Sequence, residues 1–177
     1  GIRASDTCEL YFDNVKVSVD NLIGNEGEGF KIALATLDGG RIGIAAQALG
    51  IAQASLNASV SYSKERIQFG KPISINQAIQ FKIADMAMEI ESARLLVRQA
   101  AWKKDQKQNY SHVASMAKVY ASEVAMRAST QCVQIHGGFG YMREAGVERL
   151  MRDAKITQIY EGTSEIQRVV IARSILK

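Results

Sequence analysis

The chain is patterned mostly for helices, because apolar residues recur at intervals of three and four over long stretches. The first stretch follows a glycine-rich connector at residues 21–29 and ends near Ile67, where a glycine and a proline follow. The second follows Ser74, and the third runs from about Ser111 to the glycine pair at 137–138. With one proline in 177 residues the chain has few helix breakers, so these stretches predict three long helices.

Two shorter helices complete the prediction. One covers about residues 145–152, and the last begins with Thr163 or Ser164 as its N-cap. The second long helix is expected to open with a capping box formed by Ser74 and Gln77. The third long helix carries a stripe of small residues: Ala114, Ala117, Ala121, Ala125 and Ala128. Together these elements predict an all-α fold, an antiparallel bundle of the four-helix type.

Residues 7–19 break the helical pattern. Aromatic and β-branched residues flank an Asp13-Asn14 turn signal, which predicts two short strands or one strand and a turn. So small a β unit is not stable by itself. We therefore interpret residues 1–24 as the tail of a middle β-domain with its connector, and residues 25–177 as the helical domain. Because the chain opens without a methionine, we expect it to be part of a longer protein.

Composition narrows the classes of function. Hydrophobic residues make up 47% and charged residues 23%, and no apolar run is long enough for a membrane span. A net charge of +4 without a run of basic residues, and with 7% aromatic residues, argues against nucleic-acid binding. Cys8 and Cys132 are expected to be reduced thiols. The spacing between the two histidines and these cysteines is not that of metal ligands, so no metal site is predicted.

One segment near the C-terminus has the arrangement expected of a general base. Glu161 and Gly162 directly precede the last helix. Glycine permits a tight turn and a close approach to the backbone, and the N–H groups of a first helical turn can bind an anion or polarise a carbonyl. The alternative is that Glu161 only complements the helix dipole while Thr163 only caps the helix.

Three other segments carry candidate binding groups. In the Asp-Gly-Gly-Arg sequence at 38–41, the arginine suits an anion and the glycines clear room for a flat or long ligand; the alternative is a close helix–helix contact with a surface arginine. The arginine of Arg-Ile-Gln-Phe-Gly at 66–70 suits a phosphate, unless it only faces a helix dipole. The glycine pair in segment 134–138 exposes backbone that suits a nucleotide, unless it is a plain helix C-cap.

Taken together, these segments resemble the acyl-CoA dehydrogenase family, and specifically its C-terminal helical domain, over essentially the whole chain. The similarity is greatest to the short-chain, butyryl-CoA type. The motifs that carry it occur in this order: Asp-Gly-Gly-Arg at 38–41, Glu-Arg-Ile-Gln-Phe-Gly-Lys-Pro at 65–72, Gln-Ile-His-Gly-Gly-Phe-Gly-Tyr at 134–141, Met-Arg-Asp-Ala-Lys at 151–155 and Gln-Ile-Tyr-Glu-Gly-Thr-Ser-Glu-Ile-Gln-Arg at 158–168.

The resemblance implies an FAD-dependent enzyme that oxidises acyl-CoA thioesters to trans-2-enoyl-CoA. Glu161 would match the base that removes the α-proton. Gly40 stands where relatives of the isovaleryl type carry their base, so Glu161 is expected to be the only base. The substrate positions implied are Asp38, Arg41 and Gly162. The cofactor positions implied are Arg66, Gln68, Phe69, Gln77, Gln134, Gly137, Gly138, Thr163 and Glu165.

The resemblance also implies partners and a cellular location. Electron-transfer flavoprotein would reoxidise the flavin, and further copies of the chain would form a tetramer, since some family contacts reach the flavin of a neighbouring subunit. The bacterial cytoplasm and the mitochondrial matrix are the expected locations. The isolated chain is expected to bind FAD weakly and to have no turnover, because the family's other domains supply most flavin contacts. Two alternatives stay open: a non-catalytic helical module for CoA binding or assembly, and an acyl-CoA oxidase.

Overall fold

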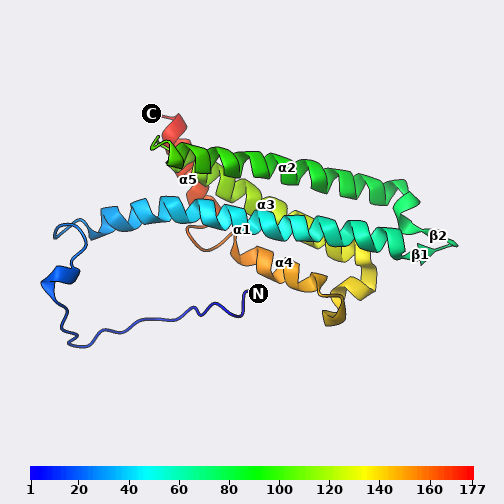
Figure 1. The fold of residues 1–177 in the computed structure, drawn as a ribbon, viewed down its shortest axis with the longest axis horizontal. Helices are drawn as coiled ribbons and strands as arrows, with labels where there is room; N and C mark the ends of the chain where they lie inside the picture. Colours follow the sequence, from blue (N-terminus) through cyan, green and yellow to red (C-terminus); the bar gives the residue numbers. More distant parts are fainter.

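The computed structural model describes all of residues 1–177. Five α-helices form its body, and three of them are long and lie side by side along the longest axis (Figure 1). The first four run in alternating directions, which confirms the predicted antiparallel bundle, and the fifth packs across one end. The helices are α1 (Gly29–Glu65), α2 (Gln77–Asp105), α3 (Ser111–His136), α4 (Val147–Ile156) and α5 (Ser164–Ile175).

Helix α3 is the centre of the core, since it contacts each of the other four helices. A cluster of 18 buried apolar residues, most of them alanines, fills the space where α1, α2 and α3 meet. The predicted stripe of small residues is confirmed, because all five of its alanines are buried. Small side chains allow helices to approach closely, and this closeness brings residues of α1, α3 and the α4–α5 link into contact.

The predicted capping box at the start of α2 is wrong. After α1, a minimal antiparallel hairpin forms from β1 (Ile67–Gln68) and β2 (Lys71–Pro72). Ser74 lies in the 3₁₀ turn that follows, Ile73–Ile75, and Asn76 is the residue that precedes the helix as its N-cap. The turn closes before the helix begins, so the Ser74 hydroxyl lies too early in the chain to reach the first helical N–H groups.

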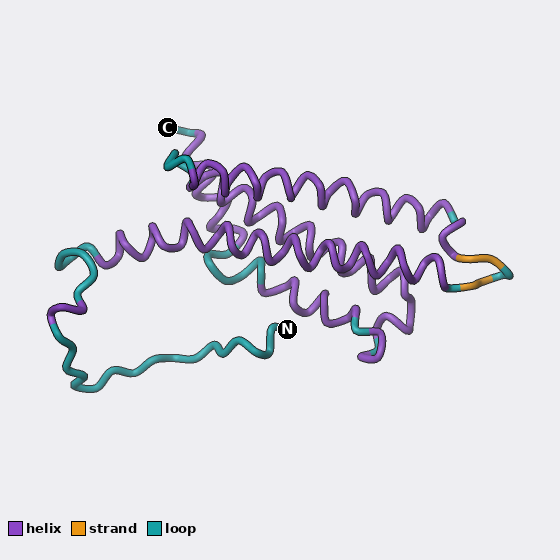
Figure 2. The backbone as a smooth tube through the Cα atoms, viewed as in Figure 1, coloured by secondary structure: helices purple, strands orange, loops and turns teal.

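The predicted strands within residues 7–19 are also wrong, since no strand forms there. The segment is extended and exposed, and it forms the long loop beside the bundle (Figure 2). A strand needs a neighbour that exchanges ladder hydrogen bonds with it, and nothing in this chain pairs with the segment. The side chains of Leu10, Tyr11 and Phe12 are consequently 72%, 83% and 78% exposed.

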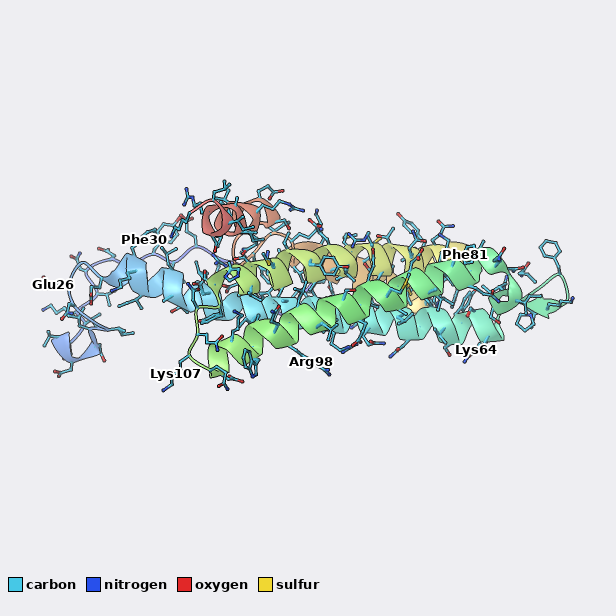
Figure 3. All side chains as sticks on the ribbon, turned by 90° about the horizontal axis from the view of Figure 1, so that it is seen from above. Glu26, Phe30, Lys64, Phe81, Arg98 and Lys107 are labelled. Carbon is cyan, nitrogen blue, oxygen red and sulfur yellow. The ribbon has the colours of Figure 1, made fainter.

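The N-terminal end of α1 extends beyond the other helices, and Phe30 points into solvent there (Figure 3). Its side chain is 77% exposed, and that of Leu34 one turn later is 45% exposed. Exposed apolar residues gathered at one end are typical of a surface that another part of a larger protein covers. None of the five helices has the length and apolar character required to cross a membrane.

Candidate active site

The link between α4 and α5 holds Glu161 in an unusual backbone conformation. Its φ angle is +55°, and that of Gly162 is +86°, so two successive residues lie in the left-handed region. A residue other than glycine in this region carries strain of about 1 kcal/mol or more, which the surrounding structure has to offset. Thr163 then begins α5 as its N-cap, with its hydroxyl accepting from the Ile166 N–H at 3.4 Å.

Two buried side chains hold the backbone of this link. The Gln167 amide donates to the carbonyl of Glu161 at 3.1 Å and to that of Gly162 at 2.9 Å. The Lys118 ammonium, from α3, donates to the Gly162 carbonyl at 2.6 Å. Both Lys118 and Gln167 are 0% exposed. A Cβ at Gly162 would lie 2.7 Å from the Gln167 amide nitrogen, so this clamp requires glycine.

The Glu161 side chain reaches α1 and lies against Gly40. A Cβ at Gly40 would overlap the Oε2 atom of Glu161, so the glycine makes the room that the carboxylate occupies. This Oε2 atom is buried and has no hydrogen-bond partner. A buried, unpartnered carboxylate oxygen is unfavourable by itself, yet it is a suitable proton acceptor for a substrate that enters the site. Gly40 thus makes room for a side chain of this chain, and the expectation that the glycines make room for a ligand stays a prediction.

Arg41 is the buried cation beside this contact. Its side chain is only 6% exposed and lies 2.5 Å from Asp38, with a second hydrogen bond to Ser115 at 3.3 Å. Asp38 also accepts from the Ser111 hydroxyl at 3.0 Å. The alternative of a surface arginine is therefore wrong. The Nε atom of Arg41 is buried without a partner, so one donor of the guanidinium stays available.

The charges of the site influence one another. Burial, with the nearby charge of Arg41, lowers the pKa of Lys118 to about 8, although Glu161 opposes this shift. Burial also raises the pKa of Tyr160. The hydrogen bond of Tyr160 to Gln47 acts in the opposite direction, and the charge of Glu161 acts in the same direction as burial. The charge of Lys118 thus lies close enough to those of Glu161 and Arg41 to interact with both.

A second group of predicted residues meets at the opposite end of α1. Arg66 and Gln68 line a hollow of 510 Å³ together with Gly137 and Gly138. A Cβ on either glycine would meet nothing within 4 Å, so their backbone is open to a ligand. In the same hollow, the ring of Tyr62 stacks on His136 (centroids 4.1 Å apart) and on Phe139 (6.2 Å). A guanidinium, flat rings and open backbone suit a planar, anionic ligand such as a nucleotide.

The remaining predicted cofactor residues lie outside that hollow. Phe69, at the tip of the β-hairpin, is fully exposed, and Gln77 and Gln134 are exposed on α2 and α3. Thr163 and Glu165 line a small hollow of 190 Å³ at the start of α5. There the backbone N–H of Glu165, with the Thr163 hydroxyl, lowers the pKa of the Glu165 carboxyl.

The two groups are far apart in one chain. Arg41 and Arg66 are 25 residues apart on a single helix, which corresponds to about 37 Å at 1.5 Å per residue. The structure therefore brings Glu161 together with Asp38, Arg41 and Gly162, and separately brings together Arg66, Gln68, Gly137 and Gly138.

Sequence reasoning missed Lys118 and Gln167. A signal for Lys118 was present, because it lies four residues after Ala114 and three before Ala121, on the face of the alanine stripe. A lysine on the small-residue face of a helix is expected to be buried and therefore to have a specific partner. Gln167 carries no comparable signal.

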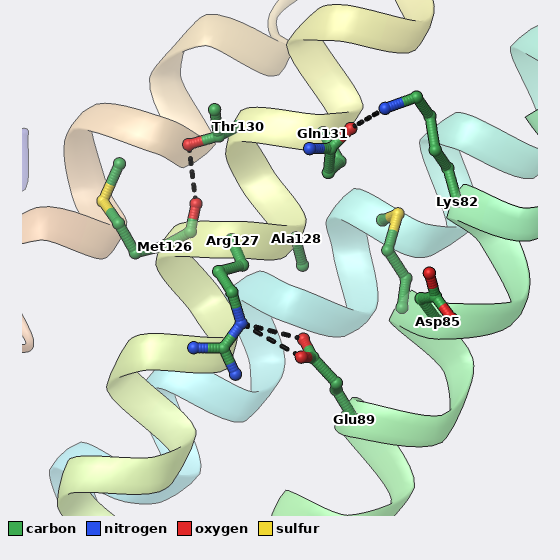
Figure 4. Close-up of a pocket in the computed structure, with 9 residues that line it drawn as sticks. Lys82, Asp85, Glu89, Met126, Arg127, Ala128, Thr130 and Gln131 are labelled. Carbon is green, nitrogen blue, oxygen red and sulfur yellow. Dashed lines mark hydrogen bonds and ion pairs between the residues drawn. The ribbon is translucent and has the colours of Figure 1, made fainter.

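A further hollow, of 390 Å³, lies between α2 and α3 and contains none of the predicted site residues (Figure 4). The Arg127–Glu89 ion pair at 3.0 Å and the Lys82–Gln131 hydrogen bond at 2.5 Å cross it. Four of its polar side chains thus pair with one another. Gln131 lies 13 positions after Lys118 on α3, which puts it about 20 Å from the Glu161 site.

The fold and the site define a helical domain that holds a glutamate against a glycine of α1, just before its last helix. Comparison with known families agrees, since the family described as "Acyl-CoA dehydrogenase, C-terminal domain" matches residues 27–176. The chain belongs to the acyl-CoA dehydrogenase family and corresponds to its C-terminal domain. The resemblance drawn from the motifs is thereby confirmed.

Several relatives of the chain are named as short-chain members of the family. It is 56% identical, over 177 residues, to the mitochondrial short-chain specific acyl-CoA dehydrogenase of Bos taurus, and it covers 43% of that protein. Butyryl-CoA dehydrogenase from Megasphaera elsdenii matches 94% of the chain at 58% identity and a TM-score of 0.93, and 43% of that structure's chain is covered. A structure of the electron transferring flavoprotein of Acidaminococcus fermentans also matches 94% of this chain, with 58% identity and a TM-score of 0.93. The match covers 44% of the chain in that structure. The chain thus spans less than half the length of these relatives.

Proposed function

We propose that the protein containing this chain dehydrogenates short-chain acyl-CoA thioesters to trans-2-enoyl-CoA, with FAD as the hydride acceptor and Glu161 as the base. The observation that carries the proposal is the position of the Glu161 carboxylate, which is buried against Gly40 with one oxygen unpartnered. A glutamate that only complemented a helix dipole would have its carboxylate at the helix end in solvent. Here its Oε2 atom is buried against Gly40 of α1 instead.

The chemistry required of the chain is the removal of a weakly acidic proton. Glu161 takes the proton from the α-carbon of the thioester, and the negative charge that develops on the thioester oxygen needs hydrogen-bond donors. The backbone N–H groups of Glu161 and Gly162 donate to nothing within the chain, so both are available for that oxygen. Arg41, with one unpartnered donor, binds a polar part of the substrate beside Asp38.

The hollow at the opposite end of α1 fits part of FAD. Arg66 would pair with the pyrophosphate, and the open backbone of Gly137 and Gly138 would lie along the adenosine. FAD supplies the acceptor for the β-hydride when it is bound. Phe69, Gln77, Gln134, Thr163 and Glu165 stay proposed cofactor contacts, and none of them lies in the same hollow.

A tetramer of such chains, organised as a dimer of dimers, is part of the proposal. The separation of about 37 Å between Arg41 and Arg66 supports it, because a cofactor held by Arg66 of one chain would then serve the base of a neighbour. The fully exposed Phe69 beside Arg66 is also suited to reach a second chain. We further propose electron-transfer flavoprotein as the electron acceptor, and the bacterial cytoplasm or the mitochondrial matrix as the location.

Substitution of the base tests the proposal in the complete protein. Glu161→Gln keeps the size of the side chain and removes its ability to accept a proton. We expect butyryl-CoA to bleach the flavin absorbance of the wild type under anaerobic conditions. In the variant, the rate of bleaching should be at least a thousandfold lower, and CoA ligands should still bind. Glu144→Gln, on an exposed glutamate near α4, is the matched control. Bleaching at the wild-type rate in Glu161→Gln would show that another group is the base.

A further inference from the structure

Lys118 is the most unusual buried group in the molecule. It is the largest of the fully buried side chains, and lysine is almost never fully buried unless it is paired with a carboxylate. Here no carboxylate lies within ion-pair distance of it. Its one hydrogen bond goes to the backbone carbonyl of Gly162, at 2.6 Å.

Stability alone does not account for an ammonium at this place. The Gly162 carbonyl already accepts from the Gln167 amide at 2.9 Å, so it would have a partner without Lys118. Removing a lysine ammonium from water is unfavourable, and a methionine of similar length would fill the same space without that desolvation. The site therefore keeps a charged group that the packing of α3 does not need.

The position of Lys118 gives it influence over Glu161. Because Oε2 of Glu161 has no partner of its own, the direction of the carboxylate depends on the backbone of residues 161 and 162. Lys118 and Gln167 are the two side chains that hold this backbone, and only Lys118 carries a charge. Its charge also lies close enough to those of Glu161 and Arg41 to interact with both.

We propose that Lys118 is a positioning residue for the base: its ammonium holds the Gly162 carbonyl, and thereby keeps the Glu161 carboxylate directed at Gly40 and the substrate. This inference rests on the proposed function. It assigns to Lys118 a role in proton removal rather than in substrate binding, since its ammonium faces the backbone of the link and not the Asp38–Arg41 pair.

The test uses the complete protein with FAD bound and the variant Lys118→Met. We expect kcat per bound flavin to fall at least tenfold, the KM for butyryl-CoA to change less than threefold, and the thermal midpoint to stay equal or rise. The exchange of α-protons of a bound acyl-CoA with deuterated solvent is expected to slow by the same factor. Lys82→Met is the matched control, because Lys82 is a half-buried lysine on α2 that binds Gln131 far from Glu161.

Several outcomes decide against the inference. Wild-type kcat in Lys118→Met overturns it, and so does a lower thermal midpoint with an unchanged kcat per bound flavin, which is what a structural role predicts. If Lys118→Met does not fold, Lys118→Gln is measured in the same way, and wild-type kcat and exchange there overturn the inference too. A wild-type protein that does not oxidise butyryl-CoA overturns the proposed function, and this is seen before any substitution is made.

Discussion

Glu161 depends for its position on residues that lie far from it in the sequence. Gly40 leaves the space for its carboxylate, and Lys118 and Gln167 hold its backbone. The carboxylate itself makes no hydrogen bond through Oε2. At the scale of residues, the proposed site therefore consists of one carboxylate and of several groups that contact it or its backbone.

Gly40 provides a sharp test of this arrangement. In Gly40→Ala the new Cβ overlaps Oε2 of Glu161, so the carboxylate has to move. We expect kcat of the complete protein to fall at least tenfold. Gly43→Ala is the control, because the same methyl group on the same helix meets nothing within 4 Å. That variant should keep its activity and gain up to about 1 kcal/mol of helix stability. Equal kcat values in the two variants would contradict the contact.

The titration of Lys118 predicts how stability depends on pH. Its pKa is lowered from 10.5 to about 8, so between these values the unfolded chain binds more protons here than the folded chain does. Stability should therefore rise with pH, by at most about 1.4 kcal/mol per unit. Burial raises the pKa values of Cys132 and Tyr160, so the folded chain keeps these protons to higher pH than the unfolded chain does. The two groups therefore lower stability as pH rises, Cys132 above about pH 9 and Tyr160 above about pH 10.

The difference between wild type and Lys118→Met removes those two opposing contributions. From pH 8 to pH 9 the unfolding free energy of the wild type should rise relative to that of the variant, by up to about 1 kcal/mol. Urea unfolding followed by circular dichroism at each pH measures this. A difference that stays constant across the window would show that Lys118 titrates normally in the folded protein.

At the scale of elements, two local sequence patterns led to correct predictions. The alanine stripe predicted the buried face of α3, and Thr163 was among the expected N-caps of α5. The capping box at Ser74 failed because a 3₁₀ turn between β2 and α2 uses that residue. The strands at 7–19 failed because strand formation depends on a partner that this chain does not contain.

The candidate site was only partly predictable for the same reason. The motifs around Gly40 and Glu161 were visible, and the glycines were expected to admit a ligand, but nothing local says that Glu161 lies against Gly40. Lys118 was overlooked because lysine is usually a surface residue. Its burial follows from the packing of α3 against the α4–α5 link, which sequence spacing does not describe.

At the scale of the whole molecule, the chain carries two separated groups of functional residues. Arg41 lies in the N-terminal half of α1 near Glu161, and Arg66 follows the C-terminal end of that helix, about 37 Å away. If the proposed roles hold, one chain offers its base to one ligand and the hollow beside Arg66 to another. The assignment of residues 1–24 to a neighbouring β-domain stays a prediction.

The most direct measurement is the exchange of α-protons in the complete protein. Butyryl-CoA is incubated in deuterated water with wild type and with Glu161→Gln, and mass spectrometry follows deuterium at the α-carbon. The account predicts exchange in the wild type and none above background in Glu161→Gln, with the thioester bound in both. Deuterium uptake at the wild-type rate in the variant would contradict the claim that Glu161 is the base.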